Sequence, residues 1–181
     1  RYCEESLTLY TNLGHHVGKA RVLVRLANFV NTLGQPAKAI EYWNQGLAIS
    51  KKIGDRLSAA RAMSMLSVKM WQSGGEKRPQ ALPLLQESLA FCREIGHQNQ
   101  TVIFLIMLSN MTIHQQKYQV AKQYALEALT ICNKLSFDLE KSRVLSVLAE
   151  AVRRLGDLST ANIYLSEALQ FALSRVSIHP E

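Results

Sequence analysis

A leucine that recurs about every 40 residues is the feature that most constrains how this chain can fold. The residue immediately before each of these leucines is always small. The leucines are Leu7, Leu47, Leu89, Leu129 and Leu169. The small residues are Ser6, Gly46, Ser88, Ala128 and Ala168. A fixed period of this length indicates that one structural unit is repeated along the chain.

Two further series keep the same period. The first is a leucine followed by Ala or Ser, at Leu26, Leu66, Leu108 and Leu148. The second is an alanine, at Ala39, Ala81, Ala121 and Ala161. Small residues at fixed positions let two helices approach closely while leucines fill the space between neighbouring pairs. The three series together predict a repeat array.

Each period contains two helices. Apolar residues between Val22 and Leu33 follow steps of three and four, and Gly34 ends that helix. Pro36 then begins a second helix that Gly54 ends. Neither helix can bury its apolar face alone, so neighbouring pairs must stack. The predicted fold is therefore all-α, a right-handed α-solenoid of stacked antiparallel helical hairpins.

The period divides the chain into one partial and four complete pairs. Residues 1–13 form the second helix of a partial repeat, and the complete pairs span 18–53, 55–95, 97–135 and 137–175. An enlarged turn, "SGGEKRP" at residues 73–79, is expected to be a mobile, solvated loop, with a contact loop as the alternative. The whole of 1–181 is read as a single array cut from a longer protein.

The pattern resembles the tetratricopeptide repeat. That family has a leucine followed by Gly or Ala in the first helix and two alanines in the second. The residues that match here are Leu26 with Ala27, then Ala39 and Gly46. The period near 40 residues and the ending "IGDR" resemble the longer variant of kinesin light chains, polarity adaptors, bacterial peptide-sensing regulators and signal-transducing ATPases. The resemblance implies non-catalytic binding of a partner, because none of those proteins uses the repeat for chemistry.

No arrangement of residues in the sequence points to catalysis. The histidines His15, His16, His97 and His114 have no Cys, Asp or Glu at ligand spacing, so we expect solvated histidines, no metal site and no cofactor. A phosphate-binding loop is also missing, since "SGG" lacks the lysine and hydroxyl residue that such a loop needs. The protein is predicted not to be an enzyme.

The three cysteines are expected to be packing residues. Cys92 and Cys132 occupy the same repeat position, and with Cys3 the number of cysteines is odd. Small buried thiols in a reducing compartment, the cytoplasm, explain them better than a disulfide or a metal site.

In the family that the chain resembles, the first helix of each pair lines a concave groove. The residues five positions before each leucine of the second series are Arg21, Arg61, Ile103 and Arg143. The residues two positions after each of these leucines are Asn28, Val68, Asn110 and Glu150. Apolar groove positions are expected at Val24, Ile106 and Trp71. Guanidinium groups bind carboxylates, and asparagine amides can hold a peptide backbone. The expected partner is a protein or peptide segment with acidic and apolar residues. Alternatively, the arginines descend from repeat duplication and pair with nearby acids.

Two other functions remain open. The formal net charge of +7 would suit a solenoid that binds nucleic acid, although the basic residues are scattered and do not alternate with aromatic ones. An oligomerisation module would use the apolar last helix, which carries Ile163, Tyr164, Leu165, Leu169, Phe171 and Leu173. No uninterrupted apolar run of about 18 residues predicts a membrane span.

Overall fold

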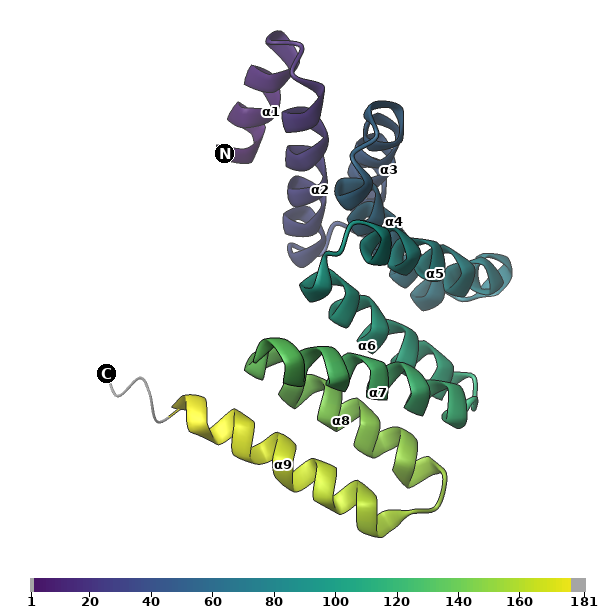
Figure 1. Ribbon diagram of the computed structural model, residues 1–181. Coiled ribbons are helices and arrows are strands. Elements are labelled where there is room, and N and C mark those ends of the chain that lie inside the picture. Colours follow the sequence, from purple (N-terminus) through teal and green to yellow (C-terminus); the bar gives the residue numbers. More distant parts are fainter. Residues whose placement is uncertain (1, 177–181) are drawn as a thin grey trace. The chain divides into compact units, whose positions relative to one another are not determined.

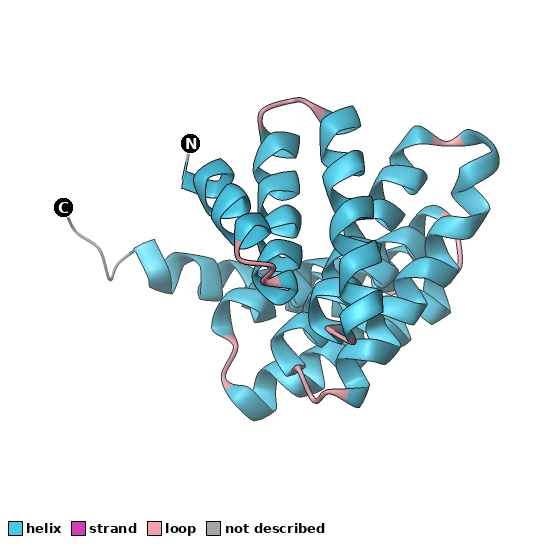
Figure 2. Cartoon of the chain, turned by 90° about the horizontal axis from the view of Figure 1, so that it is seen from above, coloured by secondary structure: helices cyan, strands magenta, loops and turns pink. Residues whose placement is uncertain are grey.

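The computed structural model describes residues 2–176, and for residues 138, 139 and 174–176 it describes the backbone only. Residue 1 of the expected first helix lies outside the described residues. Residues 2–176 contain nine α-helices and no strand (Figures 1 and 2). The helices are α1 (Tyr2–Asn12), α2 (His16–Thr32), α3 (Pro36–Ile53), α4 (Arg56–Ser73), α5 (Arg78–Glu94), α6 (Gln98–His114), α7 (Tyr118–Leu135), α8 (Asp138–Arg154) and α9 (Leu158–Val176). The predicted all-α class is confirmed.

Consecutive helices pack as hairpins. The pairs are α2 with α3, α4 with α5, α6 with α7 and α8 with α9, and α1 packs against α2 (Figure 1). The turns inside the first and fourth pairs contain Gly34 and Gly156, with φ of 76° and 92°. This left-handed conformation is one that glycine adopts without steric cost, so each turn can be very short.

The chain forms two compact units, unit 1 up to Gly96 and unit 2 from His97 onward. In unit 1 the first helices of the two complete pairs, α2 and α4, contact each other, and in unit 2 the same is true of α6 and α8. We call the surfaces that these helices share the α2–α4 face and the α6–α8 face. The single array over residues 1–181 stays a prediction.

The alanine series is buried within the hairpins. All four alanines, from Ala39 to Ala161, are essentially inaccessible to solvent. In the second pair the Ser67 hydroxyl donates a hydrogen bond of 2.6 Å to the carbonyl of Ala81, and in the third pair Ser109 donates one of 2.8 Å to Ala121. These bonds join the two helices of a pair at the positions where both residues are small.

Glycine is needed at one of the small positions. A Cβ atom added to Gly46 would lie 3.0 Å from Cγ2 of Val24 on α2. Real Cβ contacts are rarely that short, so α3 can lie this close to α2 because position 46 has no side chain.

The second leucine series forms the core between helices. Leu108 and Leu148 are fully buried, and Leu26 and Leu66 are exposed by 6 % or less. In unit 1 these leucines pack with Trp43, and in unit 2 Leu148 packs with Val152. The packing role that the repeat pattern predicted for this series is confirmed.

The turn in the second pair differs from the expected loop at 73–79. Ser73 still belongs to α4, residues Gly75–Lys77 form a short 3₁₀ helix, and Arg78 already belongs to α5. Proline is favourable in the first turn of a helix, where its missing N–H would have no partner, so Pro79 allows α5 to begin early. The guanidinium of Arg78 lies 4.3 Å from the ring centroid of Trp71, which ties the turn to α4.

Two of the histidines have a structural role that the sequence did not reveal. Nδ1 of His15 accepts a hydrogen bond of 3.0 Å from the backbone N–H of Gly18, and His97 accepts one of 3.3 Å from Gln100. Both residues are N-caps of first helices, and Asp55 is the N-cap of the first helix in the second pair. The first N–H groups of a helix lack partners within the helix, so capping satisfies them.

The buried cysteines fit a packing role. Cys92 and Cys132 are fully buried free thiols at the same position of α5 and α7. Burial raises the pKa of each thiol to about 11. At neutral pH both are therefore protonated, whereas metal binding and nucleophilic reactions need the thiolate.

None of the described helices combines the length and the apolar character that crossing a bilayer requires.

Replacing Leu108 with alanine should test this packing. Leu108 is fully buried, so the substitution should leave a cavity and lower the free energy of unfolding by about 2 to 5 kcal/mol. Leu126→Ala on α7 is the control, because Leu126 is more than one-third exposed. Urea unfolding of both variants measures the difference; equal losses would contradict the assignment of Leu108 to the core.

Candidate functional site

On the α2–α4 face, Arg21 is already paired. Its Nε atom lies 3.3 Å from Oδ2 of Asp55. Burial alone would raise the pKa of Asp55, but hydrogen bonds from Ser58 and Arg21 outweigh it, and the pKa is lowered. Arg21 therefore supports the capping aspartate of α4, as the alternative of pairing with nearby acids predicts.

Asn28 also makes a hydrogen bond within the protein. Its side-chain carbonyl oxygen accepts a hydrogen bond of 2.9 Å from Nε1 of Trp43, which is completely buried. A buried indole N–H needs an acceptor, and Asn28 supplies it. The oxygen that was expected to hold a peptide backbone thus stabilises the hairpin. The other expected residues on α4 are all half-buried: Arg61, Val68 and Trp71.

Val24 and Ile106 were wrongly assigned to the groove. Each side chain is only 3 % exposed. Val24 packs beneath Gly46, where the absence of a side chain lets α3 approach α2. Both residues belong to the hydrophobic core and cannot present a surface to a partner.

The α6–α8 face also carries accessible side chains, and they differ in chemistry between the two helices. The partly or fully exposed side chains on α6 include Ile103, Met107, Asn110, Ile113 and His114, and those on α8 include Arg143, Ser146, Val147, Glu150 and Arg154. Arg143 and Asn110 make no hydrogen bond or ion pair with any other residue in the described part of the chain. One helix supplies mainly apolar and amide groups, and the other supplies mainly charged groups.

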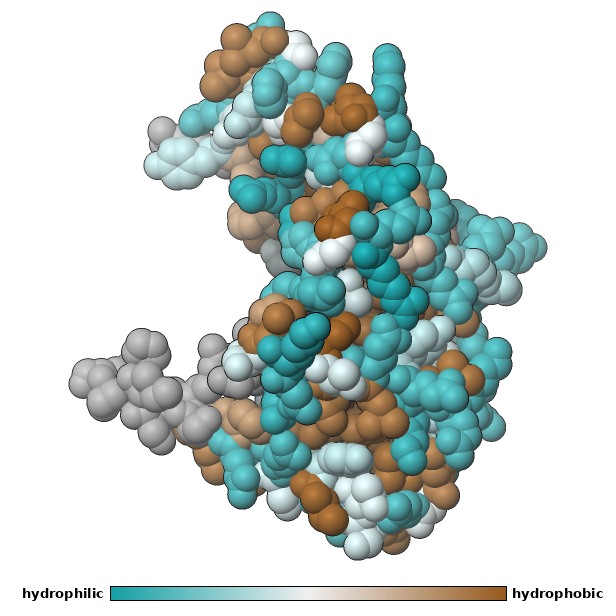
Figure 3. All heavy atoms as spheres, in the orientation of Figure 1, coloured by the Kyte–Doolittle hydropathy of each residue, from teal (hydrophilic) through white to brown (hydrophobic). Residues whose placement is uncertain are grey.

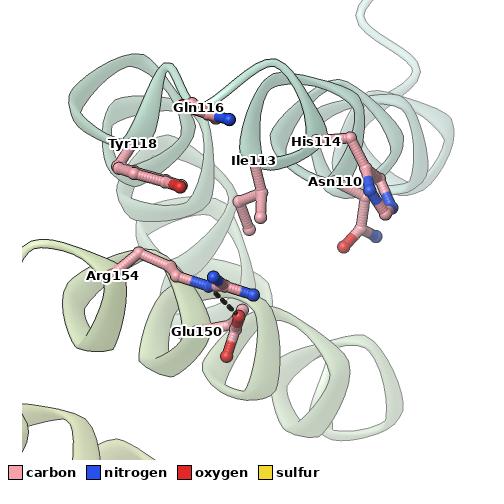
Figure 4. A pocket seen from close by; sticks show the side chains of 7 residues that line it. All are labelled: Asn110, Ile113, His114, Gln116, Tyr118, Glu150 and Arg154. Atoms are coloured by element: carbon pink, nitrogen blue, oxygen red, sulfur yellow. Dashed lines mark hydrogen bonds and ion pairs between the residues drawn. The ribbon is translucent and has the colours of Figure 1, made fainter.

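A pocket of about 320 Å³ lies at one end of this face. Figure 4 shows the side chains around it: three from α6, one from the α6–α7 turn, one from the start of α7 and two from α8. They are Asn110, Ile113, His114, Gln116, Tyr118, Glu150 and Arg154. Of the residues expected from the sequence, the pocket brings together Asn110 and Glu150.

The other lining residues were missed for identifiable reasons. Ile113 stands at the same repeat position as Trp71, which the sequence predicts to line the groove, so the repeat pattern also indicates Ile113. Arg154 stands four residues after Glu150, on the same side of α8. Gln116 and Tyr118 lie in and just after a turn, and counting along helices does not show where a turn places its side chains.

An ion-pair network fixes one wall of the pocket. The Glu150 carboxylate accepts hydrogen bonds of 2.8 Å from Nε and Nη2 of Arg153 and from Nε of Arg154. The bonds from Arg153, followed by the one from Arg154, lower the pKa of Glu150 to about 2. Glu150 is therefore ionised at neutral pH, and Arg154 is oriented through a charge-assisted bond.

The backbone at Gln116 is unusual. Its φ is +61°, whereas glycine occupies the same turn position in the first and fourth pairs, at Gly34 and Gly156. A residue with a Cβ atom pays about 1 to 2 kcal/mol to adopt this left-handed conformation. Residues in such conformations are concentrated at functional sites.

Comparisons with known proteins identify the fold. No protein-family model matches the chain. The solved structure of BtubC (BKLC) from P. vanneervenii matches with a TM-score of 0.78 and 18 % identity over 92 % of this chain and 68 % of that one. A signal transduction ATPase with numerous domains and a tetratricopeptide repeat sensor, PH0952 from Pyrococcus horikoshii, matches with a TM-score of 0.73 and 20 % identity, over 87 % of this chain and 24 % of that one. The fold is that of the tetratricopeptide repeat.

One curated protein is also similar in sequence. This chain is 25 % identical over 165 residues to the regulatory protein AfsR of Streptomyces griseus. The match covers 91 % of this chain but only 16 % of the length of that regulatory protein.

Proposed function

We propose that this chain is a non-catalytic recognition module that holds a protein or peptide segment against the α6–α8 face, as the sensor or scaffold part of a larger regulatory protein. The observation that carries the proposal is the pocket on that face, together with Arg143 and Asn110, which have no partner within the described residues. Polar groups that are available at a hollow surface can bind a ligand without first breaking internal contacts.

The similarity to other proteins supports this role. AfsR is a regulatory protein, and PH0952 carries a tetratricopeptide repeat sensor in a signal transduction ATPase. Because the chain spans 16 % of the length of AfsR, it would correspond to one part of such a regulator.

The face also indicates the character of the segment. Ile103, Met107 and Ile113 are partly exposed on α6, whereas Arg143 is exposed on α8. An extended or helical segment with apolar residues on one side and acidic residues on the other would match both helices.

Several basic residues lie in ion pairs, which weakens the case for nucleic acid. Lys51 lies 3.8 Å from Glu87, Lys141 lies 3.4 Å from Glu167, and Arg56 pairs with Glu94. A nucleic-acid interface would instead need a continuous row of cations available for phosphates.

Charge reversal on the face should weaken binding selectively. The chain is used to select binders from a displayed library of random short peptides, and affinities are measured at two salt concentrations. Arg143→Glu should reduce affinity for the selected peptides by about tenfold, because it replaces an attractive charge with a repulsive one. Lys134→Glu is the control, since Lys134 is exposed on the second helix α7.

Equal losses of affinity in the Arg143 and Lys134 variants would contradict the proposed face. So would a selection that returns no binding peptide.

The surface of α9 favours self-association as a second candidate function. Leu165 and Leu169 are 46 % and 59 % exposed, although the residue equivalent to Leu165 in the first pair, Trp43, is fully buried. Figure 3 shows apolar residues at the surface in the region of α9. A second copy of the chain could cover these leucines, because exposed apolar patches commonly mark protein interfaces.

Sedimentation equilibrium tests the self-association. The chain should form dimers in a concentration-dependent manner, and Leu165→Gln combined with Leu169→Gln should make it monomeric by removing the apolar contact. Leu9→Gln on α1, where Leu9 is 57 % exposed, is the control and should leave the dimer intact. A chain that stays monomeric at high concentration before any substitution would exclude this function.

A further inference from the structure

We propose that the pocket between α6, the α6–α7 turn and α8 is a specificity pocket that accepts one acidic side chain, aspartate or glutamate, of the bound segment. Arg154 would be its principal contact. This inference rests on the proposed function, and it adds which part of the face selects the ligand and by which chemistry.

One hydrogen bond orients the Arg154 guanidinium and leaves its two Nη atoms available to a ligand. Its Nε atom donates to Oε1 of Glu150 at 2.8 Å, and no other residue within the described part of the chain contacts its two Nη atoms through a hydrogen bond or ion pair. Figure 4 shows the guanidinium at the pocket wall, on the same side as Glu150. A guanidinium fixed at one edge keeps donors available at the other, and a carboxylate can accept from them.

The charges around the pocket favour an anion. The single carboxylate of Glu150 is shared by two guanidinium groups, so this network retains one positive charge in excess. In addition, α7 begins at the pocket with Tyr118, and no side chain caps its N-terminus. The N-terminus of an 18-residue helix carries a partial positive charge that attracts carboxylates.

A basic side chain would fit the same pocket poorly. Glu150 could attract it, but this carboxylate already accepts three hydrogen bonds, and its pKa of about 2 shows how strongly the arginines stabilise it. A lysine or arginine of the ligand would have to displace one of these bonds and would approach Arg154 as a like charge.

The remaining lining residues suit one side chain of an extended segment. The Tyr118 hydroxyl and the Gln116 and Asn110 amides can each donate a hydrogen bond, and Ile113 offers an apolar contact. A volume of about 320 Å³ holds a side chain with its flanking backbone but not a whole helix.

The left-handed backbone at Gln116 belongs to the turn that ends α6, where the N–H of Lys117 donates a hydrogen bond of 2.9 Å to the carbonyl of Thr112, and it gives a way to test the role of Gln116 in the pocket. The protein has a second residue of this kind, Ser136, which has φ of +53° at the C-terminus of α7. Glycine would relieve the strain at either position. Ser136 does not line the pocket, so the two positions form a matched pair that separates backbone strain from a role in binding.

The experiment uses the full chain and the peptides selected from the displayed random library. Each peptide is compared with a version in which its acidic residues are replaced by Asn or Gln, against the unmodified chain and against Arg154→Gln. The amide version should bind at least about tenfold more weakly to the unmodified chain, because it loses a charge-assisted bond. For Arg154→Gln this difference should shrink to less than about threefold. Thermal unfolding checks that each variant is folded.

The glycine variants complete the test. Gln116→Gly and Ser136→Gly should both raise the melting temperature, because both remove left-handed strain. Only Gln116→Gly should weaken peptide binding, since it also removes an amide donor from the pocket. Unchanged affinity in Gln116→Gly would exclude Gln116 from the site.

The outcomes separate the two proposals. One outcome is that peptide binding depends on Arg143, but the ratio of affinities between each acidic peptide and its amide version is the same for Arg154→Gln and for the unmodified chain. In that case the specificity pocket is wrong and the proposed function stands. Selected peptides that are rich in basic residues, or lack acidic ones, would also overturn the pocket. If no peptide binds the chain, both proposals fail.

Discussion

The close packing of small residues inside each hairpin is the constraint on which the rest of the structure depends. The alanine series from Ala39 to Ala161 is buried at the contact between the two helices, and in the middle pairs Ser67 and Ser109 add hydrogen bonds to the alanine carbonyls. A larger side chain at these positions would separate the helices and expose the buried leucines. Because each hairpin is fixed in this way, some repeat positions of the first helices stay accessible in every pair, as at Arg21, Arg61, Ile103 and Arg143.

The repeats then differ in how these outward positions are used. In unit 1, Arg21 pairs with Asp55 and Asn28 bonds to Trp43, so the polar groups stabilise the fold itself. In unit 2, Arg143 and Asn110 have no such partners among the described residues. One repeat pattern can therefore supply internal support in one unit and an accessible surface in the other, and this difference supports the proposed binding to the α6–α8 face.

The fold could be predicted from the sequence because leucines and small residues recur at a fixed period along the chain. The candidate site could be predicted only in part. Counting from Leu108 and Leu148 selected Asn110 and Glu150, and both line the same pocket. The same counting placed Ile106 in the groove, but a buried helix face is wide enough to include that position. Gln116 could not be predicted, because its position depends on a left-handed turn that the sequence suggests only where glycine is present.

The central claim is that a bound segment lies on the α6–α8 face, and the most direct measurement is the location of a selected peptide by NMR. With isoleucine and leucine methyl groups labelled, intermolecular nuclear Overhauser effects should connect the peptide to the methyl groups of Ile113, which line the pocket. The account predicts such contacts and none to Leu165 or Leu169 on α9. Contacts confined to the α9 leucines, with the Ile113 signals unchanged, would contradict it.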